Sequence, residues 1–281
     1  MINTAKAKKK FGRVFIHICA IIMSAFCLFP IYWMLITSLK SNTEIYRLVP
    51  TFWPENVVWD GYIKLFTETA FLQNVLNSLI VTIVVSVISV FVSMLAAYAI
   101  ARKTFRGRTG VSQSILYAYL MPPMVLFIPL YLLVVKVGLA DSIWGLVLVY
   151  PTITIPYATW MLISYFKTIP LEIEQAAIVD GCSRAGVMFR ICFPLSAPGI
   201  ITTLVFSFTL CWSEYLYALV IINNTMNKTI TLGLADMVVA DVYAWGPLMG
   251  GSIIASIPVV VLYLLCNRYL ISGMTAGGVK M

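Results

Sequence analysis

Long apolar segments constrain this chain more than any other feature of its sequence. A helix needs about 20 residues to cross a hydrocarbon core of roughly 30 Å, and six segments reach that length. Hydrophobic residues make up 61% of the 281 residues and charged residues only 11%, against about 25% in a soluble domain. The sequence therefore predicts an all-α integral membrane protein, a single domain with six transmembrane helices. The predicted spans are residues 14–39, 74–101, 111–135, 143–166, 197–222 and 247–271.

The positions of Lys and Arg predict the orientation of these spans. Six crossings put both termini on one side, and a cytoplasmic N-terminus places 14 of the 19 Lys and Arg residues inside. Such an excess is what the positive-inside rule describes, so we expect an N-in, C-in protein. Its cytoplasmic parts include an N-terminal tail (1–13), the connection between the second and third spans, a connection at 167–196 and a C-terminal tail (272–281). The net charge of +8 comes with no nucleic-acid recognition motif, so no nucleic-acid partner is expected.

The two longer external connections have different compositions. Residues 40–73 carry Trp53, Trp59 and Tyr62 among charges, which suits either a lid at the membrane interface or a surface that docks a protein. The pattern of residues 223–246 predicts a short amphipathic helix bearing Asp236 and Asp241.

Prolines interrupt the predicted spans. Each removes a backbone hydrogen bond and favours a kink. Kinked helices suit a moving pathway, but proline is also common in membrane helices generally, so both interpretations stay open. The prolines concerned are Pro30, Pro122, Pro123, Pro129, Pro151, Pro156 and Pro258.

Catalytic signatures are missing from the sequence. The segment "GMTAGGVKM" has Gly273 and Gly278 at the spacing of a phosphate-binding loop, but Val279 follows the second glycine and no Ser or Thr follows Lys280. The only histidine is His17, and neither a zinc-protease nor a nucleophile-elbow motif is present. We therefore expect no catalytic residues, no metal site and no cofactor in this chain.

A mixed-charge segment inside the cytoplasmic connection has the signals of a helix. In "PLEIEQAAIVDG", Pro170 occupies the first turn, Glu172 and Glu174 lie at the positive end, and Gly181 ends the helix. Ser183 is a candidate cap for a second short helix over 184–193, which Pro194 is expected to stop.

This segment resembles a known motif. The run Q-A-A-I-V-D-G, followed by Phe189 and by P-L-x-x-P at 194–198, resembles the EAA loop of permease subunits of binding-protein-dependent ABC importers. The stretches "NVLNSLIVTIVVSVISVFVSMLAAYAIARKTFRGR" and "SGMTAGGVK" are similar to the carbohydrate branch, the inner permeases of the maltose transporter type. The similarity covers the chain from about residue 12 onward.

The resemblance implies a permease of a bacterial cytoplasmic (inner) membrane, working with a second permease, an ATPase dimer that binds ATP and Mg²⁺, and an extracytoplasmic solute-binding protein. It assigns ATPase coupling to the helix at 171–182. This chain departs from the motif because Gln175 stands where the family usually has glutamate, and Glu174, one position earlier, points about 100° away. The resemblance also implies that the tail contacts the ATPases; a frayed terminus is the alternative. The coupling residues are Glu174, Gln175, Ala176, Ala177, Asp180 and Gly181, and the tail residues are Thr275, Gly277, Gly278 and Lys280.

The substrate side is marked by aromatic residues around one carboxylate. Trp212, Glu214 and Tyr215 lie in the fifth predicted span, where a charge is costly unless it faces a partner or a wet cavity. Aromatic faces suit sugars, and the resemblance to the carbohydrate branch implies a sugar (oligosaccharide, glycoside or polyol) as the substrate. Two alternatives stay open: a docking or signalling subunit that forms no pathway, and an importer of glycerol-phosphate-type solutes.

Overall fold

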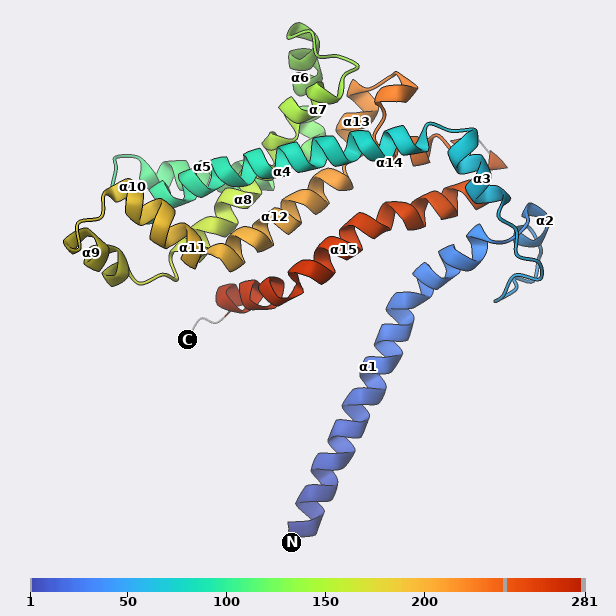
Figure 1. Cartoon of the computed structure of the whole chain (residues 1–281), viewed down its shortest axis with the longest axis horizontal. Coiled ribbons are helices and arrows are strands. Elements are labelled where there is room, and N and C mark those ends of the chain that lie inside the picture. The colour runs from blue at the N-terminus through green and yellow to red at the C-terminus, as the bar shows by residue number, and fades with distance from the viewer. Residues whose placement is uncertain (1, 240–241, 279–281) are drawn as a thin grey trace. The chain divides into compact units, whose positions relative to one another are not determined.

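The computed structural model describes residues 2–239 and 242–278, with the side-chain surroundings of residues 13–238 and 244–270. The described chain is helical apart from one antiparallel pair of two-residue strands (Figure 1). It divides into two compact units. Unit 1 contains Met1–Thr69 and Asp236–Ser256, and unit 2 contains Ala70–Ala235 and Ile257–Met281.

Unit 1 joins the two ends of the sequence through a close backbone contact. Helix α3 meets the beginning of the last helix, α15, where Gly61 faces Gly246. A Cβ atom on Gly61 would lie 2.7 Å from the carbonyl carbon of Gly246, so this packing requires a residue without a side chain. The elements of unit 1 are α1 (Ile2–Ser38), α2 (Asn42–Ile45), α3 (Asp60–Thr67), β1 (Val238–Val239), β2 (Val242–Tyr243) and the first part of α15 (Trp245–Gly278).

The connection between α1 and α3 is folded around a buried carboxylate. Glu44 is buried and accepts hydrogen bonds from the backbone N–H of Glu55, at 3.2 Å, and from the hydroxyl of Thr51. Lys40 is buried as well; its ammonium group donates to the carbonyl of Thr51 and lies 5.0 Å from the ring centroid of Trp33. These internal bonds give the connection a defined conformation.

Unit 2 is built on the long helix α4, which packs against α8 and α12 (Figure 1). Its buried face carries a stripe of small polar side chains, and these let the helix backbones approach closely. The hydroxyl groups of Ser89 and Thr154 lie 2.6 Å apart, and Ser93 donates to the carbonyl of Ile155 at 3.2 Å. The stripe is formed by Asn74, Asn77, Ser78, Thr82, Ser86, Ser89 and Ser93.

The helices of unit 2 vary from one turn to eight or more turns in length. They are α4 (Phe71–Arg102), α5 (Arg108–Leu120), α6 (Pro123–Lys136), α7 (Ile143–Val149), α8 (Pro151–Phe166), α9 (Leu171–Val179), α10 (Arg184–Gly186), the π-helical turn η1 (Val187–Cys192), α11 (Phe193–Leu195), α12 (Ala197–Trp212), α13 (Leu216–Ile221), the 3₁₀ turn η2 (Thr225–Asn227), α14 (Ile230–Ala235) and the remainder of α15.

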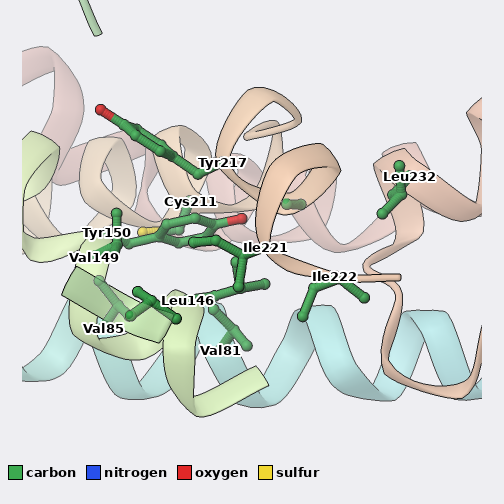
Figure 2. Close-up of a cluster of buried hydrophobic side chains, with 12 residues drawn as sticks. Val81, Val85, Leu146, Val149, Tyr150, Cys211, Tyr217, Ile221, Ile222 and Leu232 are labelled. Atoms are coloured by element: carbon green, nitrogen blue, oxygen red, sulfur yellow. The ribbon is translucent and has the colours of Figure 1, made fainter. Parts of the chain in front are cut away.

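One of the two apolar clusters of unit 2 lies where α4, α7 and α13 meet. Val81 and Val85 rise from α4 toward Tyr150, Cys211 and Ile221 (Figure 2). Tyr150 is 1% exposed, and Tyr217 is buried and donates its hydroxyl hydrogen to the carbonyl of Pro123 at 3.1 Å. The cluster ties the short helix α13 to the long helices of the unit.

Four helical segments of the described chain are long and apolar enough to cross a membrane, and the number rises to six if each of two bent pairs is one span. The continuous segments are Arg13–Ser38, Phe71–Arg102, Ile143–Phe166 and Trp245–Leu270. The first bent pair, α5 and α6, turns by 96° at Met121 and Pro122, where the sequence predicted a kink. The second pair turns by 73° between Leu195 and Ala197.

The connection at 223–246 differs from its prediction. The helix α14 ends at Ala235, before Asp236, and the strand pair β1–β2 follows it. The β-branched residues of "MVVADVY" favour paired strands over an amphipathic helix. Asp241 lies outside the described residues.

The terminal helices extend into segments that were predicted as tails. Helix α1 begins at Ile2 and α15 ends at Gly278. Thr275, Gly277 and Gly278 therefore belong to the last helix, while Lys280 lies outside the described residues. Lys and Ala, which make up residues 5–10, are good helix formers, and this explains why α1 begins before its apolar stretch.

Candidate functional site

The mixed-charge segment forms the helix α9, which begins after Pro170 and ends at a glycine. Pro170 has extended backbone angles at the N-cap, and Glu172 and Glu174 lie in the first turn. At the other end Gly181 has φ +87°, and the N–H of Cys182 donates to the carbonyl of Ala177 at 2.9 Å. This left-handed turn satisfies the last carbonyls of the helix, as the sequence predicted for Gly181.

The inward face of α9 is held by a carboxylate. Glu174 is 7% exposed, and its Oε1 lies 2.5 Å from Nε of Arg102, the last residue of α4. Tyr98, one turn earlier on α4, donates its hydroxyl hydrogen to Oε2 at 3.1 Å. Ala177 is buried beside them in the second apolar cluster of the unit. The helix is therefore attached to the C-terminal end of α4.

The outward face of α9 is apolar and exposed. Ile178 is 50% exposed and Val179 is 86% exposed, and Gln175 and Ala176 lie beside them at the surface. An isolated exposed Leu or Ile is ordinary, but a helix whose outer side is formed by small and apolar residues suits contact with another protein. Asp180 and Gly181, at the end of the helix, are also exposed.

The predicted coupling residues thus fall on two faces. Gln175, Ala176, Asp180 and Gly181 are accessible, whereas Glu174 and Ala177 face the membrane-spanning helices. Sequence reasoning separated Glu174 from Gln175 by the helical rotation, but it did not find Arg102 or Tyr98 as partners of Glu174. The one available signal was the spacing of Tyr98 and Arg102, four residues apart on one helical face.

The second half of the segment differs from its prediction. Ser183 caps it as expected, since the N–H of Gly186 donates to its hydroxyl at 3.1 Å. Pro194 does not stop the helix, which continues to Leu195. The π-helical turn over Val187–Cys192 precedes the proline, and its wider backbone relieves the clash that a proline ring causes in a regular helix.

Glu214 lies at a break between two helices. Helix α12 ends at Trp212 and α13 begins at Leu216. The carboxylate accepts hydrogen bonds from the N–H of Tyr217, at 2.9 Å, and of Ala218, at 3.3 Å. Glu214 thus supplies the acceptors that the first turn of α13 requires. Its own carbonyl accepts from the hydroxyl of Thr231 at 2.7 Å.

The other two predicted pathway residues have different surroundings. Trp212 is buried and stacks on Phe208, with ring centroids 5.7 Å apart. Tyr215 is 36% exposed in the unwound segment. A cavity of about 170 Å³ lies near this break, between the kink at Pro122 and helix α8. It is lined by Ala118, Tyr119, Met121, Pro123, Leu126, Thr152, Ile153, Leu210 and Tyr217.

In the part of the chain that the structure describes, no three His, Cys, Asp or Glu side chains lie together where they could hold a metal ion.

Taken together, the long apolar helices define a membrane protein, and α9 is a short helix whose outer face is exposed. Residues 89–274 match the model of the family described as binding-protein-dependent transport system inner membrane component. The chain belongs to this family, whose members are multi-pass permease subunits of ABC transporters in the inner membrane.

Several relatives align along their full length. The chain is 36% identical to the inner membrane ABC transporter permease protein YcjP of Escherichia coli, covering 98% of this chain and 99% of the relative. It is 32% identical to the diacetylchitobiose uptake system permease protein DasC of Streptomyces coelicolor (96% and 98% covered). It is also 32% identical to the trehalose/maltose transport system permease protein MalG of Thermococcus litoralis (95% and 97%).

A solved structure has the same fold. In the crystal structure of a bacterial ABC transporter involved in the import of the acidic polysaccharide alginate, one chain superposes with a TM-score of 0.77 at 20% identity, covering 92% of this chain and 96% of that chain.

Proposed function

We propose that this chain is one of two permease subunits of an ATP-driven importer of a sugar: an oligosaccharide, a glycoside or a polyol. Relatives named for diacetylchitobiose and for trehalose and maltose align with nearly the whole chain, and their names support a sugar substrate. The partners in this proposal are a second permease, an ATPase dimer and an extracytoplasmic solute-binding protein. ATP and Mg²⁺ bind to the ATPases.

The proposed topology has six spans with both termini in the cytoplasm. The bent pair α5–α6 and the bent pair that ends in α12 each count as one span in this arrangement. The excess of Lys and Arg on the side of the N-terminus supports the orientation. The kink at Pro122 and the break at Glu214 then lie within the third and fifth spans.

The outward face of α9 is the proposed contact with an ATPase subunit, and its exposed apolar character is the observation that carries this assignment. Gln175, Ala176 and Asp180 present small or polar groups around Ile178 and Val179. Glu174 and Ala177 have a different role, which is to hold the helix on the spans. The tail residues Thr275, Gly277, Gly278 and Lys280 are a second proposed contact with the ATPases.

The proposed substrate pathway passes the break at Trp212, Glu214 and Tyr215. An unwound segment between two helices exposes backbone groups that are tolerated at membrane depth only in protein or beside water. Tyr215 is the most accessible of the three residues. Glu214 caps α13 through both of its carboxylate oxygens, and each oxygen keeps a further acceptor site.

Affinity purification from native membranes in mild detergent, followed by reconstitution into liposomes, tests the proposal. We expect an ATPase and a second permease to co-purify, and the reconstituted complex to accumulate sugar when ATP and the loaded binding protein are supplied. Recovery of the chain alone, while a control importer survives the same detergent, would contradict it. A complex that assembles without transporting any solute would instead indicate a docking or signalling subunit.

A further inference from the structure

Two residues of α4 bind the side chain of one residue of α9. Tyr98 and Arg102 are four positions apart on the last turns of α4, and both reach the carboxylate of Glu174. Arg102 also donates from Nη2 to the carbonyl of Ile169 at 2.7 Å, just before α9 begins. Both the entry to α9 and its inward face are therefore fastened to the same end of α4.

We propose that the Arg102–Glu174 ion pair is the mechanical joint that carries the movement of α9 into α4, a role that rests on the proposed function. The side chains of the pair are 6% and 9% exposed. Separating two buried opposite charges leaves each without compensation, which is strongly unfavourable. A displacement of α9 consequently moves the end of α4 with it, whether α9 is pushed or pulled.

Aromatic rings cover one side of the joint and extend it to two further helices. The ring of Tyr98 lies edge to face against Phe166 of α8 and Phe193 of α11, with centroids 5.9 and 6.4 Å away. Phe166 and Phe193 also contact each other at 5.8 Å. Low polarity around a charge pair strengthens it. These three rings therefore favour an ion pair that stays intact when α9 moves.

Besides Glu174, whose carboxylate also interacts with the thiol of Cys192, α9 has one buried side chain, that of Ala177. Ala177 is buried, but it presents one methyl group, while Gln175, Ala176, Ile178 and Val179 are exposed. A hollow of about 360 Å³ also lies beside the ion pair, bounded by Gln175, Arg184 and Lys103. On this side of α9 the ion pair, rather than side-chain packing, therefore fixes the helix to α4.

The test uses the assembled importer in liposomes and measures sugar taken up per ATP hydrolysed. Glu174→Gln keeps the shape of the side chain and removes its charge. We expect this variant to assemble and to hydrolyse ATP, with the uptake per ATP reduced at least tenfold. Glu172→Gln, on the exposed side of the first turn, is the matched control and should leave the ratio unchanged. The charge swap Arg102→Glu with Glu174→Arg should recover at least a third of the ratio.

Tyr98→Phe keeps the test decisive if Glu174→Gln does not assemble. It preserves the ring contacts and removes one donor to Glu174, and we expect a two- to fivefold lower ratio in a normally assembled complex. If uptake per ATP is unchanged in every variant that assembles, the proposed joint is overturned while the proposed function stands. The same conclusion follows if Glu174→Gln lowers the ratio and the charge swap does not restore it. A wild-type complex that takes up no sugar overturns the proposed function, and the joint with it.

Discussion

Two acidic residues of unit 2, Glu174 and Glu214, show how differently the same side chain is used. Glu174 bonds to Tyr98 and Arg102, more than seventy positions away on another helix. Glu214 bonds to the backbone N–H groups of Tyr217 and Ala218, three and four positions further on. The first acid connects two helices, while the second caps the helix that follows it and also interacts with the hydroxyl of Tyr150. The partners of a buried carboxylate, rather than its burial, therefore indicate what it does.

The largest expected effect is the loss of stability when Glu174 is removed. Glu174→Ala leaves Arg102 buried without its partner and should destabilise the permease by about 3–5 kcal/mol. Glu214→Ala removes a helix cap and should cost about 0.5–2 kcal/mol. Thermal unfolding of the purified complex measures both. Equal losses would break the distinction between the two acids.

A paired replacement sharpens the same comparison. Arg102→Met combined with Glu174→Leu leaves no buried charge unpaired, so it should regain most of the stability that Glu174→Ala loses. The exposed Glu172→Ala serves as the baseline. Continued instability of the apolar pair would show that α9 depends on contacts other than the ion pair.

The next effect concerns the end of α9. Gly181→Val forces a β-branched residue into a left-handed backbone at φ +87°, at a cost of about 1–2 kcal/mol, and should lower sugar uptake. Gly181→Asn adds a side chain that tolerates this conformation and should retain most of the uptake. A Cβ on Gly181 meets no atom within 4 Å in this chain, so equal loss in both variants would point to contact with a partner.

A third carboxylate, Asp141, combines features of the other two. Like Glu214 it accepts from backbone N–H groups, and like Glu174 it bonds to a segment far away in the sequence. The N–H groups of Asn224 and Asn223 hold the pKa of Asp141 below its ordinary value. A carboxyl group with a lowered pKa contributes stability above its unfolded pKa of about 3.9 and loses it as the pH falls through the folded value.

Proteolysis of the loop at 223–227 should therefore be constant from about pH 7 to pH 5 and should increase below about pH 4. Asp141 has φ +56°, a conformation that Asn also tolerates. Asp141→Asn should accordingly remove the pH dependence without disturbing the turn. A pH dependence that persists in this variant would exclude Asp141 as its source.

The smallest effect is expected at the exposed ion pair of Arg47 and Glu55 in unit 1. The hydrogen bond from Arg47 lowers the pKa of Glu55, but both side chains are about half exposed. Exposed pairs contribute little because water and salt screen them. Glu55→Gln should leave the unfolding temperature unchanged in 0.5 M salt. A clear decrease would show that this pair contributes more to stability than its exposure indicates.

The sequence was sufficient for features that depend on local rules. Apolar length predicted long helices, Pro122 predicted a kink, and Gly181 and Ser183 predicted the end of one helix and the beginning of the next. Contacts between side chains far apart in the sequence could not be predicted, because the spacing of Tyr98 and Arg102 does not indicate which acidic residue they contact. Pro194 was misjudged for a related reason, since the widened turn before it depends on packing.

Features of the pathway were predicted less well than those of α9. The position of Glu214 among apolar residues indicated an unusual carboxylate, but its use as a cap depends on the helix break after Trp212, which no proline or glycine marks. Tyr215 and Trp212 are close neighbours in sequence, yet one is exposed and the other buried. An aromatic composition cannot separate these outcomes, because the break changes the direction of each side chain.

The polar stripe of α4 has a consequence for how the protein is assembled in the membrane. Despite seven buried polar residues, α4 has the highest hydropathy of the four continuous spans, so it can enter the lipid bilayer before its partners are synthesised. Its serine and threonine hydroxyls can bond to carbonyls of their own helix while they wait. Once α8 is inserted, Ser89 and Ser93 exchange those bonds for Thr154 and Ile155. The stripe thus gives α4 a preference for α8, which offers hydrogen-bonding partners, over a helix that presents only leucines.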